Sequence, residues 1–294
     1  MDDTAVVRAP LARLRGLLAL LRPKQWIKNG FVFAPLVFAG EFLDGEAVTR
    51  AMLAFVLFCL ASSAAYIVND LKDIERDRLH PKKSRQRPLA AGIVTPRQAL
   101  FLLAILYGII VFGGLSMPKL LAVLASYLLL NLAYTVVLKH QPVVDIFIIA
   151  IGFVLRVYAG AVALSVPVSD WMFITTLCLA LYLAAVKRRQ ELQQTNKQGR
   201  MVLERYSIRL VDRYAEMSAT GALVFYSMFV MSARPQLVVT VPLVLFGLFR
   251  YWYVVEEQEV GESPTDALLA DWQLLATVVA WIAVCGWVLW PGKG

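Results

Sequence analysis

Long apolar runs, separated by short polar segments, extend along the whole chain. Each run is long enough to cross a bilayer as a helix, and no long polar linker divides them into separate domains. The pattern predicts an all-α integral membrane protein with a single domain over residues 1–294. We expect nine spanning helices, at 26 to 43, 49 to 70, 97 to 115, 119 to 138, 143 to 164, 170 to 187, 213 to 233, 236 to 252 and 269 to 290. Lys28, Asn29 and Pro35 interrupt the first of these runs.

The N-terminal segment, residues 1–23, has a different pattern. Its leucines recur at helical spacing among several arginines, and the apolar part is too short for a signal peptide and lacks a small-residue cleavage pattern. Such a segment is typical of an amphipathic helix that lies on the surface of an anionic membrane. We therefore expect residues 1–23 to be interfacial.

Composition agrees with a membrane protein, because 59% of the residues are hydrophobic and only 17% are charged. The net charge of +8 does not indicate nucleic-acid binding, since the basic residues lie in a few connections between apolar runs. If the N-terminus is cytoplasmic, 24 Lys and Arg residues fall inside and four outside. The positive-inside rule thus predicts this orientation in a bacterial inner membrane, with the polar motifs at the cytoplasmic face.

An acidic stretch, Asn69 to Asp77, follows directly on the second apolar run. If the helix continues, Asn69, Asp73 and Asp77 project from one face, about a turn apart, with Asp70 close beside them. Aligned carboxylates repel one another unless a cation lies between them, and oxygen ligands of this kind suit Mg²⁺ shared with substrate phosphates. The alternative is a solvated helix end whose acids pair with neighbouring Lys and Arg.

A basic stretch, Lys82 to Gly92, comes next and contains Arg85 and Arg87. Acidic ligands for a metal followed by bases for phosphate would form two complementary halves of one site. For this reason the metal interpretation is favoured over the solvated helix end.

Further polar residues stand at or within the apolar runs. Lys24, Gln25, Lys28 and Asn29 cluster at the start of the first run, where they would bind either substrate or lipid headgroups. Lys139 lies in a tight turn between two runs, and a short polar turn of this kind needs no function.

Arg156 lies about three turns beyond Asp145, well inside a span. An arginine at that depth is costly unless it faces a polar cavity or a counter-charge. We expect it to face a cavity where it pairs with a phosphate. An ion pair with Asp145 or another acid is the alternative, although Asp145 itself is too far along the helix for direct contact.

The order of these motifs resembles the UbiA-type prenyltransferase superfamily: an Asn-Asp-x-x-Asp-x-x-x-Asp stretch at the end of a spanning helix, then a basic loop ending Arg-Pro-Leu-x-x-Gly. The segments Leu21 to Asn29 and Leu138 to Gln141 are similar to the decaprenyl-phosphate phosphoribosyltransferases within it. The resemblance implies a UbiA-like helical bundle with a cytoplasm-facing polar cavity. It also implies that Asn69, Asp73 and Asp77 hold Mg²⁺ and act in catalysis.

The same resemblance implies the substrates. In most members a second aspartate-rich motif ends the sixth span, but here that place is basic, with Lys187, Arg188 and Arg189. This departure favours transfer of 5-phosphoribose from phosphoribosyl pyrophosphate to a polyprenyl phosphate, a precursor step for arabinose-containing cell-wall glycans. The residues expected to bind substrate are Lys24, Gln25, Lys28, Asn29, Asp70, Arg85, Arg87, Lys139, Arg156, Lys187 and Arg188.

Two other functions are weighed against this one. Prenyl transfer from a prenyl diphosphate to an aromatic acceptor is the main alternative. A transporter would place charges at mid-membrane and show inverted repeats, whereas here the charge gathers at one face and no repeat is found. The sequence leaves open whether the protein forms a homo-oligomer.

Overall fold

Several helices begin at a polar residue that caps their free backbone N–H groups. The Asp44 side chain accepts from the Glu46 N–H, and Thr95 forms a reciprocal capping box with Gln98. Ser207 and Asp271 cap two later helices in the same way. These local signals set where the apolar runs become helical.

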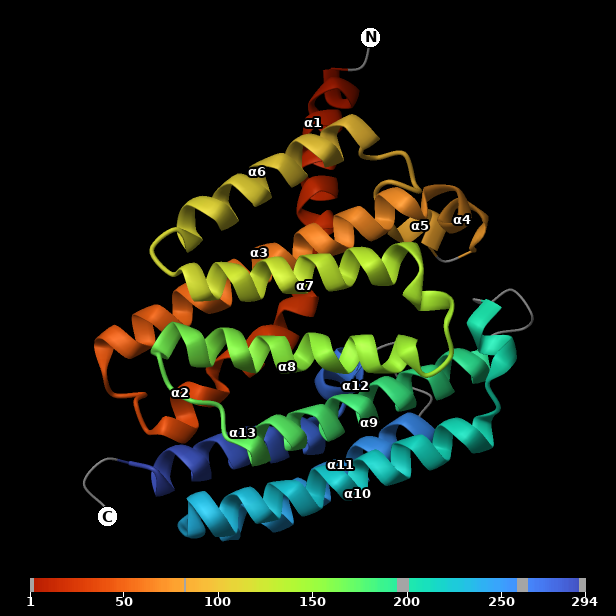
Figure 1. Cartoon of the computed structure of the whole chain (residues 1–294). Coiled ribbons are helices and arrows are strands. Elements are labelled where there is room, and N and C mark those ends of the chain that lie inside the picture. Colours follow the sequence, from red (N-terminus) through yellow and green to blue (C-terminus); the bar gives the residue numbers. More distant parts are fainter. Residues whose placement is uncertain (1–2, 82, 195–200, 258–263, 291–294) are drawn as a thin grey trace.

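The computed structural model describes residues 3–81, 83–194, 201–257 and 264–290, and every regular element in these ranges is a helix (Figure 1). The α-helices are α1 Asp3–Leu20, α2 Ala34–Ala39, α3 Gly45–Lys72, α4 Ile74–Leu79, α5 Lys83–Gln86, α6 Pro96–Gly114, α7 Pro118–Val136, α8 Val144–Leu164, α9 Asp170–Gln194, α10 Ile208–Ala233, α11 Val241–Glu257, α12 Pro264–Ala270 and α13 Trp272–Val288. Four 3₁₀ segments join them: η1 Pro23–Phe33, η2 Leu138–His140, η3 Met201–Arg205 and η4 Pro235–Thr240.

Within these ranges, six helical stretches are long and apolar enough to cross a membrane. They are α3, α6, α7, α8, α9 up to Gln193, and η4 together with α11. Helix α13 is apolar but shorter, and α10 covers the expected range 213–233.

The expected first span, 26 to 43, is not one continuous helix. Its helical part is made by η1 and the six-residue α2, and α2 is followed by Gly40, which has a positive φ of 78°. Pro35 cannot donate a backbone hydrogen bond, so a regular α-helix cannot run unbroken through this segment. Asn29, on η1, is fully buried and points its side chain into the protein.

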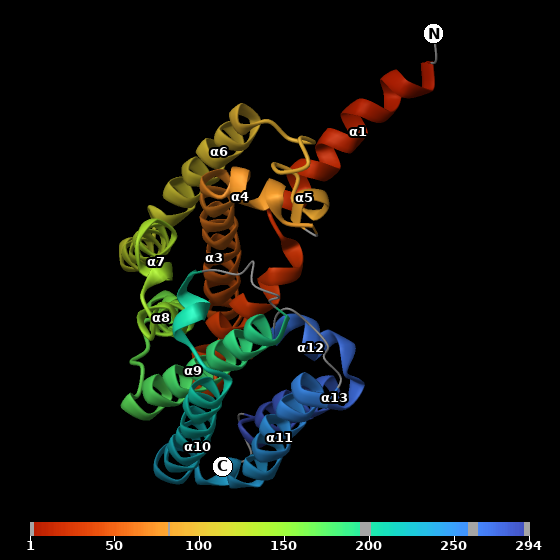
Figure 2. The ribbon, with the colours of Figure 1, turned by 90° about the vertical axis from the view of Figure 1, so that its right-hand side faces the viewer.

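The long helices follow one another around the molecule, from α6 through α7, α8, α9 and α10 to α11 (Figure 2). Helix α3 packs against α6, α7, α8 and η1, while α1 projects away from the bundle. Helix α8 lies so close to η1 that a Cβ added to Gly160 would be 1.9 Å from the Val32 carbonyl oxygen. Only glycine permits this approach.

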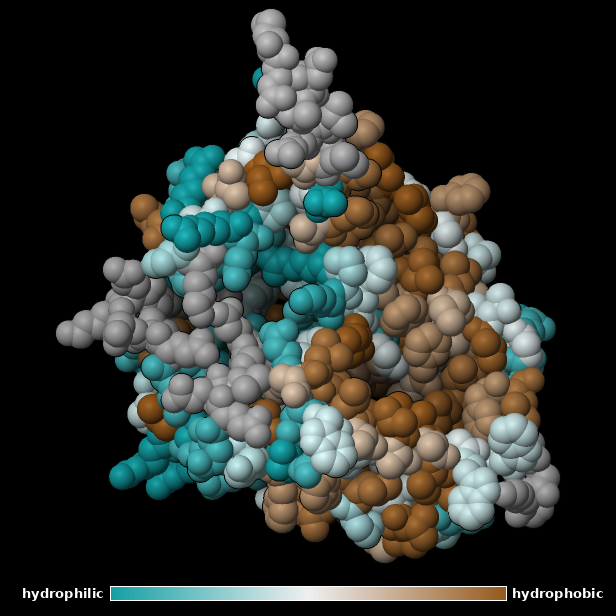
Figure 3. Space-filling view, turned by 180° about the vertical axis from the view of Figure 1, so that it is seen from behind, coloured by the Kyte–Doolittle hydropathy of each residue, from teal (hydrophilic) through white to brown (hydrophobic). Residues whose placement is uncertain are grey.

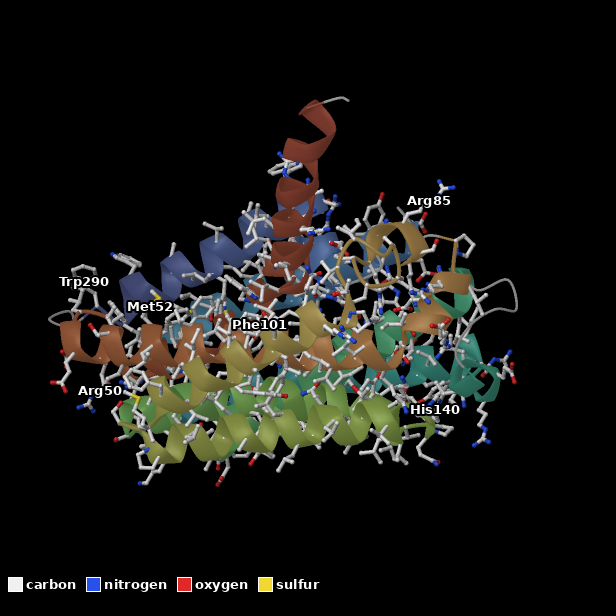
Figure 4. The ribbon with its side chains drawn as sticks, turned by 90° about the horizontal axis from the view of Figure 1, so that it is seen from above. Arg50, Met52, Arg85, Phe101, His140 and Trp290 are labelled. Atoms are coloured by element: carbon white, nitrogen blue, oxygen red, sulfur yellow. The ribbon has the colours of Figure 1, made fainter. Side chains whose placement is uncertain are left out.

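Polar and apolar residues are segregated along the molecule. On the face that Figure 3 shows, hydrophilic side chains gather toward the end that bears α4 and α5, and hydrophobic ones cover much of the rest. Figure 4 places Arg85 and His140 at this polar end, and Arg50 and Trp290 at the opposite end. The acidic stretch, the basic loop and the α7–α8 turn therefore share one end of the bundle.

Candidate active site

The acidic stretch does not form one continuous helix. Helix α3 ends at Lys72, Asp73 has φ −100° and ψ 12°, and α4 starts at Ile74. The backbone still keeps helical spacing, because the Asp73 N–H donates to Asn69 O at 3.0 Å and the Asp77 N–H donates to Asp73 O at 2.8 Å. The predicted spacing of one turn is thus retained across a local break.

The carboxylates of this stretch are held by cations from three other segments. Arg22 donates to both Asp70 oxygens, at 2.6 and 2.8 Å, and Arg87 donates to Asp70 Oδ1 at 2.8 Å. Arg87 also bridges to Asp77. Both Asp70 and Asp77 are almost fully buried, so these charged hydrogen bonds offset the cost of removing the two carboxylates from water.

Asp73 has a partner of its own. Lys139 Nζ donates to Asp73 Oδ1 at 2.8 Å and to Oδ2 at 3.1 Å, from the η2 turn 66 residues further along the chain. The Asp73 side chain is 20% exposed, whereas that of Lys139 is only 6% exposed. We refer to the group Arg22, Asp70, Asp73, Asp77, Arg87 and Lys139 as the ion-pair cluster.

The loop that carries Arg87 is folded by its own backbone. The Ala91 N–H donates to Arg87 O, and the N–H groups of Ile93 and Val94 both donate to Pro88 O. Gly92 closes this turn with φ 72°, a conformation that favours glycine. Leu89 and Val94 are buried in one apolar cluster with Ile67 of α3, so the loop is fixed next to the acids that Arg87 binds.

Arg22 belongs to the ion-pair cluster, although the sequence alone did not identify it as a site residue. It has a positive φ of 51° immediately before Pro23, an unusual conformation for a non-glycine residue. Its guanidinium lies over the Tyr66 ring, 4.7 Å from the centroid, and reaches Asp70. The Leu21-Arg22-Pro23 turn was the only sequence signal for it.

Arg156 lies inside the bundle and has no acidic partner among the described residues. Its Nε donates to the Asn29 side-chain oxygen at 2.8 Å, and its Nη1 donates to Gly152 O at 2.6 Å. The guanidinium carbon is 5.0 to 5.2 Å from three ring centroids, those of Phe58, Tyr127 and Phe153. The alternative of an ion pair between Arg156 and Asp145 is wrong, because Asp145 binds Arg188 instead.

The basic end of α9 is divided between several partners. Arg188 is fully buried and binds Asp145 at 2.6 Å, Glu191, and the Tyr134 hydroxyl at 3.1 Å. Arg189 binds Asp212 and Glu256. Lys187 is the most exposed of the three, and its Nζ lies 3.9 Å from Glu191 Oε1.

The remaining expected residues are spread around this region. Lys24 is exposed and Gln25 and Lys28 are half-buried on η1, and Asn69 is half-buried at the end of α3. Arg85 is exposed on α5 and extends outward at the polar end (Figure 4). The structure therefore separates Arg85 from Arg87, although only one residue lies between them.

The oxygen donors of this region suit a magnesium ion in part. Asn69, Asp73 and Asp77 supply amide and carboxylate oxygens on successive turns, the type of ligand that Mg²⁺ prefers. Within the described ranges, however, no three His, Cys, Asp or Glu side chains lie together as a metal site. These three residues would supply only part of the coordination shell of such an ion.

The chain is similar in sequence and in fold to known proteins. The model of the UbiA prenyltransferase family matches residues 31–269. The decaprenyl-phosphate phosphoribosyltransferase of Mycobacterium tuberculosis is 34% identical over 300 residues, covering 97% of this chain and 98% of that protein. The Corynebacterium glutamicum protein of the same name is 31% identical, covering 96% and 89%. A UbiA homolog from Archaeoglobus fulgidus, solved bound to GPP and Mg²⁺, has the same fold, with a TM-score of 0.73 at 19% identity over 93% of this chain and 99% of that one.

Proposed function

The chain belongs to the UbiA prenyltransferase family and is a multi-pass membrane transferase, and on this premise we propose that it moves 5-phosphoribose from phosphoribosyl pyrophosphate to a polyprenyl phosphate. The products are polyprenyl-phosphoryl 5-phosphoribose and pyrophosphate, the former a precursor for arabinose-containing glycans. The names of the bacterial relatives that match almost the whole chain support this choice of substrates.

One structural observation carries the proposal: the carboxylates of a single acidic stretch pair with basic residues from other segments, and Arg156 lies inside the bundle without an acidic partner among the described residues. Lys139, Arg156 and Lys187 come from η2, α8 and α9, and Arg87 comes from the loop after α5. A phosphosugar donor and a phosphorylated lipid bring a pyrophosphate and two further phosphates. Three cations already match the three carboxylates of that stretch, and Arg156 adds a further positive charge inside the bundle. This inventory of cations suits that number of anionic groups better than it suits a single allylic diphosphate.

In the reaction, the bond between C1 of ribose and the pyrophosphate oxygen breaks, and an oxygen of the lipid phosphate forms the new bond to C1. The lipid phosphate is already anionic at neutral pH, so its attack needs no general base. Asn69, Asp73 and Asp77 would hold Mg²⁺, which supplies positive charge to the leaving pyrophosphate. A UbiA homolog solved with Mg²⁺ supports this use of a divalent ion.

The chain's own cations then take the phosphates. Arg87 and Lys139 would exchange Asp77 and Asp73 for phosphate oxygens of the donor. Arg156, held by Asn29 and three aromatic rings, faces a phosphate deeper in the bundle, with Lys28 on the neighbouring η1. We assign to Lys24, Gln25 and Lys187 the first contacts with substrates that arrive from the polar end. Arg188 is buried and pairs with Asp145, so in this proposal it stabilises the site without binding a phosphate.

This proposal includes the position of the protein in the cell. The chain crosses a bacterial inner membrane nine times, η1 with α2 making the first crossing, and the polar end faces the cytoplasm. The excess of Lys and Arg in the connections at that end supports this orientation. Phosphoribosyl pyrophosphate, a soluble donor, enters from the cytoplasm, and the lipid tail lies between helices in the bilayer.

A direct comparison of two reactions tests the function. Purified full-length protein and Mg²⁺ are incubated with labelled phosphoribosyl pyrophosphate and decaprenyl or undecaprenyl phosphate, and in parallel with a prenyl diphosphate and 4-hydroxybenzoate. Labelled phosphoribosyl lipid only in the first tube supports the proposal. A prenylated aromatic product only in the second tube would replace it with prenyl transfer.

A further inference from the structure

A buried hydrogen-bond network joins the α7–α8 turn and the start of α8 to the loop before α10 and to α9. The Tyr206 hydroxyl, between η3 and α10, donates to Asp145 Oδ1 at 2.7 Å. The same hydroxyl accepts a hydrogen bond from the Val143 N–H at 2.5 Å. Arg188 Nε, on α9, donates to the other Asp145 oxygen at 2.6 Å. Tyr206 thus uses its hydroxyl both as donor and as acceptor, and ties the α7–α8 turn to the loop before α10.

The backbone at Val143 needs such support. Val143 has φ 70° and ψ −49°, a conformation that a β-branched residue rarely adopts. Strained conformations of this kind persist only where surrounding contacts hold them in place. The hydrogen bond from the Val143 N–H to Tyr206 is a contact that a residue outside the turn supplies.

The turn that contains Val143 also carries Lys139. Lys139 lies four residues earlier, in η2, and its ammonium reaches Asp73 of the ion-pair cluster. Because Lys139 is almost fully buried, it has little freedom to correct a displaced backbone. The backbone path from 139 to 143 therefore decides whether its ammonium reaches Asp73.

The phenol of Tyr206 remains a donor over the working pH range. Its burial raises the pKa of the hydroxyl above the usual value for tyrosine, and the neighbouring Asp145 carboxylate raises this pKa further. Its proton therefore stays on oxygen and is donated to Asp145 at neutral pH.

We propose that Tyr206 is a positioning residue for the transferase reaction: it fixes the α7–α8 turn so that Lys139 points at Asp73 and at the incoming phosphate. Tyr206 acts through Lys139 and contacts no substrate in this role. The role of Lys139 toward a phosphate rests on the proposed function. The role of Tyr206 in fixing the turn rests on the hydrogen bonds alone.

The test combines Tyr206→Phe with Lys139→Met in full-length protein in detergent. Tyr206→Phe should lower kcat/KM for phosphoribosyl transfer about tenfold, because Asp145 and the Val143 N–H lose a buried partner. In the Lys139→Met background the same change should alter kcat/KM less than about twofold, since residues that act through one another are not additive. Equal losses in both backgrounds, or no loss in either, would overturn the proposal.

Tyr251→Phe is the matched control. Tyr251 is buried in the same apolar cluster as Tyr206, but within the part of the chain that the structure describes its hydroxyl has no hydrogen-bond partner. It should behave like the wild type.

Hydrogen–deuterium exchange of peptides covering 137–147 gives a second readout that needs no substrate. Exchange should become faster in Tyr206→Phe and not in Tyr251→Phe, and unchanged exchange in Tyr206→Phe overturns the proposal even if Lys139→Met is too slow to assay. A wild-type protein that transfers no phosphoribose would remove the proposed function, while the exchange comparison would still decide whether Tyr206 fixes the turn.

Discussion

Arg156 donates to the side-chain oxygen of Asn29 across 127 sequence positions, and so joins α8 to η1 in the middle of the bundle. Asn29 is held in turn, because its Nδ2 donates to Ser62 Oγ and Cys59 Sγ of α3, both at 3.2 Å. Three segments therefore fix the direction of one guanidinium. A positive group held this firmly inside a membrane protein is suited to receive an anion.

Replacement of Arg156 by alanine should reduce kcat/KM at least tenfold. Charge-assisted hydrogen bonds of the kind proposed here contribute about 1.5 to 3 kcal/mol each, which corresponds to that factor or more. Steady-state kinetics with each substrate varied in turn will show which phosphate is affected. Tyr158→Phe, two residues away and partly exposed, is the control and should be neutral. Normal binding and turnover in Arg156→Ala would contradict the cavity interpretation.

Asp73→Asn should abolish nearly all turnover while the protein stays folded in detergent. The side chain keeps its size but loses the charge that pairs with Lys139 and that we assign to Mg²⁺ binding. Two measurements check this: the rate with saturating substrates, and the elution profile of the purified variant. In parallel, EDTA should stop the wild-type reaction and excess Mg²⁺ should restore it. Full activity in EDTA would argue against a metal-dependent reaction.

Arg87 and Arg85 should differ sharply when each is changed to alanine. Arg87→Ala leaves Asp77 buried without the cation that it now binds, and breaking a buried ion pair typically costs about 3 to 5 kcal/mol. We expect a lower thermal midpoint and at least a tenfold loss of kcat/KM. Arg85 is exposed on α5, so Arg85→Ala should change both quantities little. A similar loss of kcat/KM in the two variants would show that Arg85 also reaches the donor.

Gly160→Ala should destabilise the fold, because the new methyl group would collide with the Val32 carbonyl and push η1 away from α8. Overpacking of a core typically costs about 1 to 3 kcal/mol, and here the obstacle is backbone, which yields least. The thermal midpoint in detergent should fall clearly. Gly108→Ala on α6 is the control, since beyond its chain neighbours and the nearby backbone of its own helix no atom lies within 4 Å of the position of its added Cβ. Equal midpoints for the two variants would contradict the close packing.

Hydrophobic periodicity was enough to predict an all-helical membrane protein and the approximate limits of most long helices. It did not predict the break of the first expected span into η1 and α2, although Pro35 and the polar residues before it were visible. Periodicity reports which residues are apolar, whereas Asn29 is turned inward by a partner on α8 that no local pattern reveals. The break in the helix at Asp73 was not predicted either, because the residues on both sides of it favour helix.

The sequence was enough to predict most of the acidic and basic residues that form the candidate site, but it did not predict which of them pair with one another. Lys139 meets Asp73 across 66 residues, and Arg188 meets Asp145 across 43. Such pairs depend on the rotation and tilt of whole helices, which a single sequence does not specify. Arg22 and Tyr206 were overlooked because each acts through a turn with an unusual backbone.

The ion-pair cluster contains three carboxylates, on Asp70, Asp73 and Asp77, and three cations, on Arg22, Arg87 and Lys139, so its charges sum to zero. A neutral group produces only a weak field beyond its immediate neighbours, and salt screens it further. The cluster itself therefore does little to draw anions from a distance, and its contribution to the association rate of the donor should depend little on ionic strength. Other phosphate compounds bind to the cluster only if they replace the carboxylates that now pair with its cations. The cluster therefore discriminates between phosphate compounds when they bind and not while they diffuse toward it.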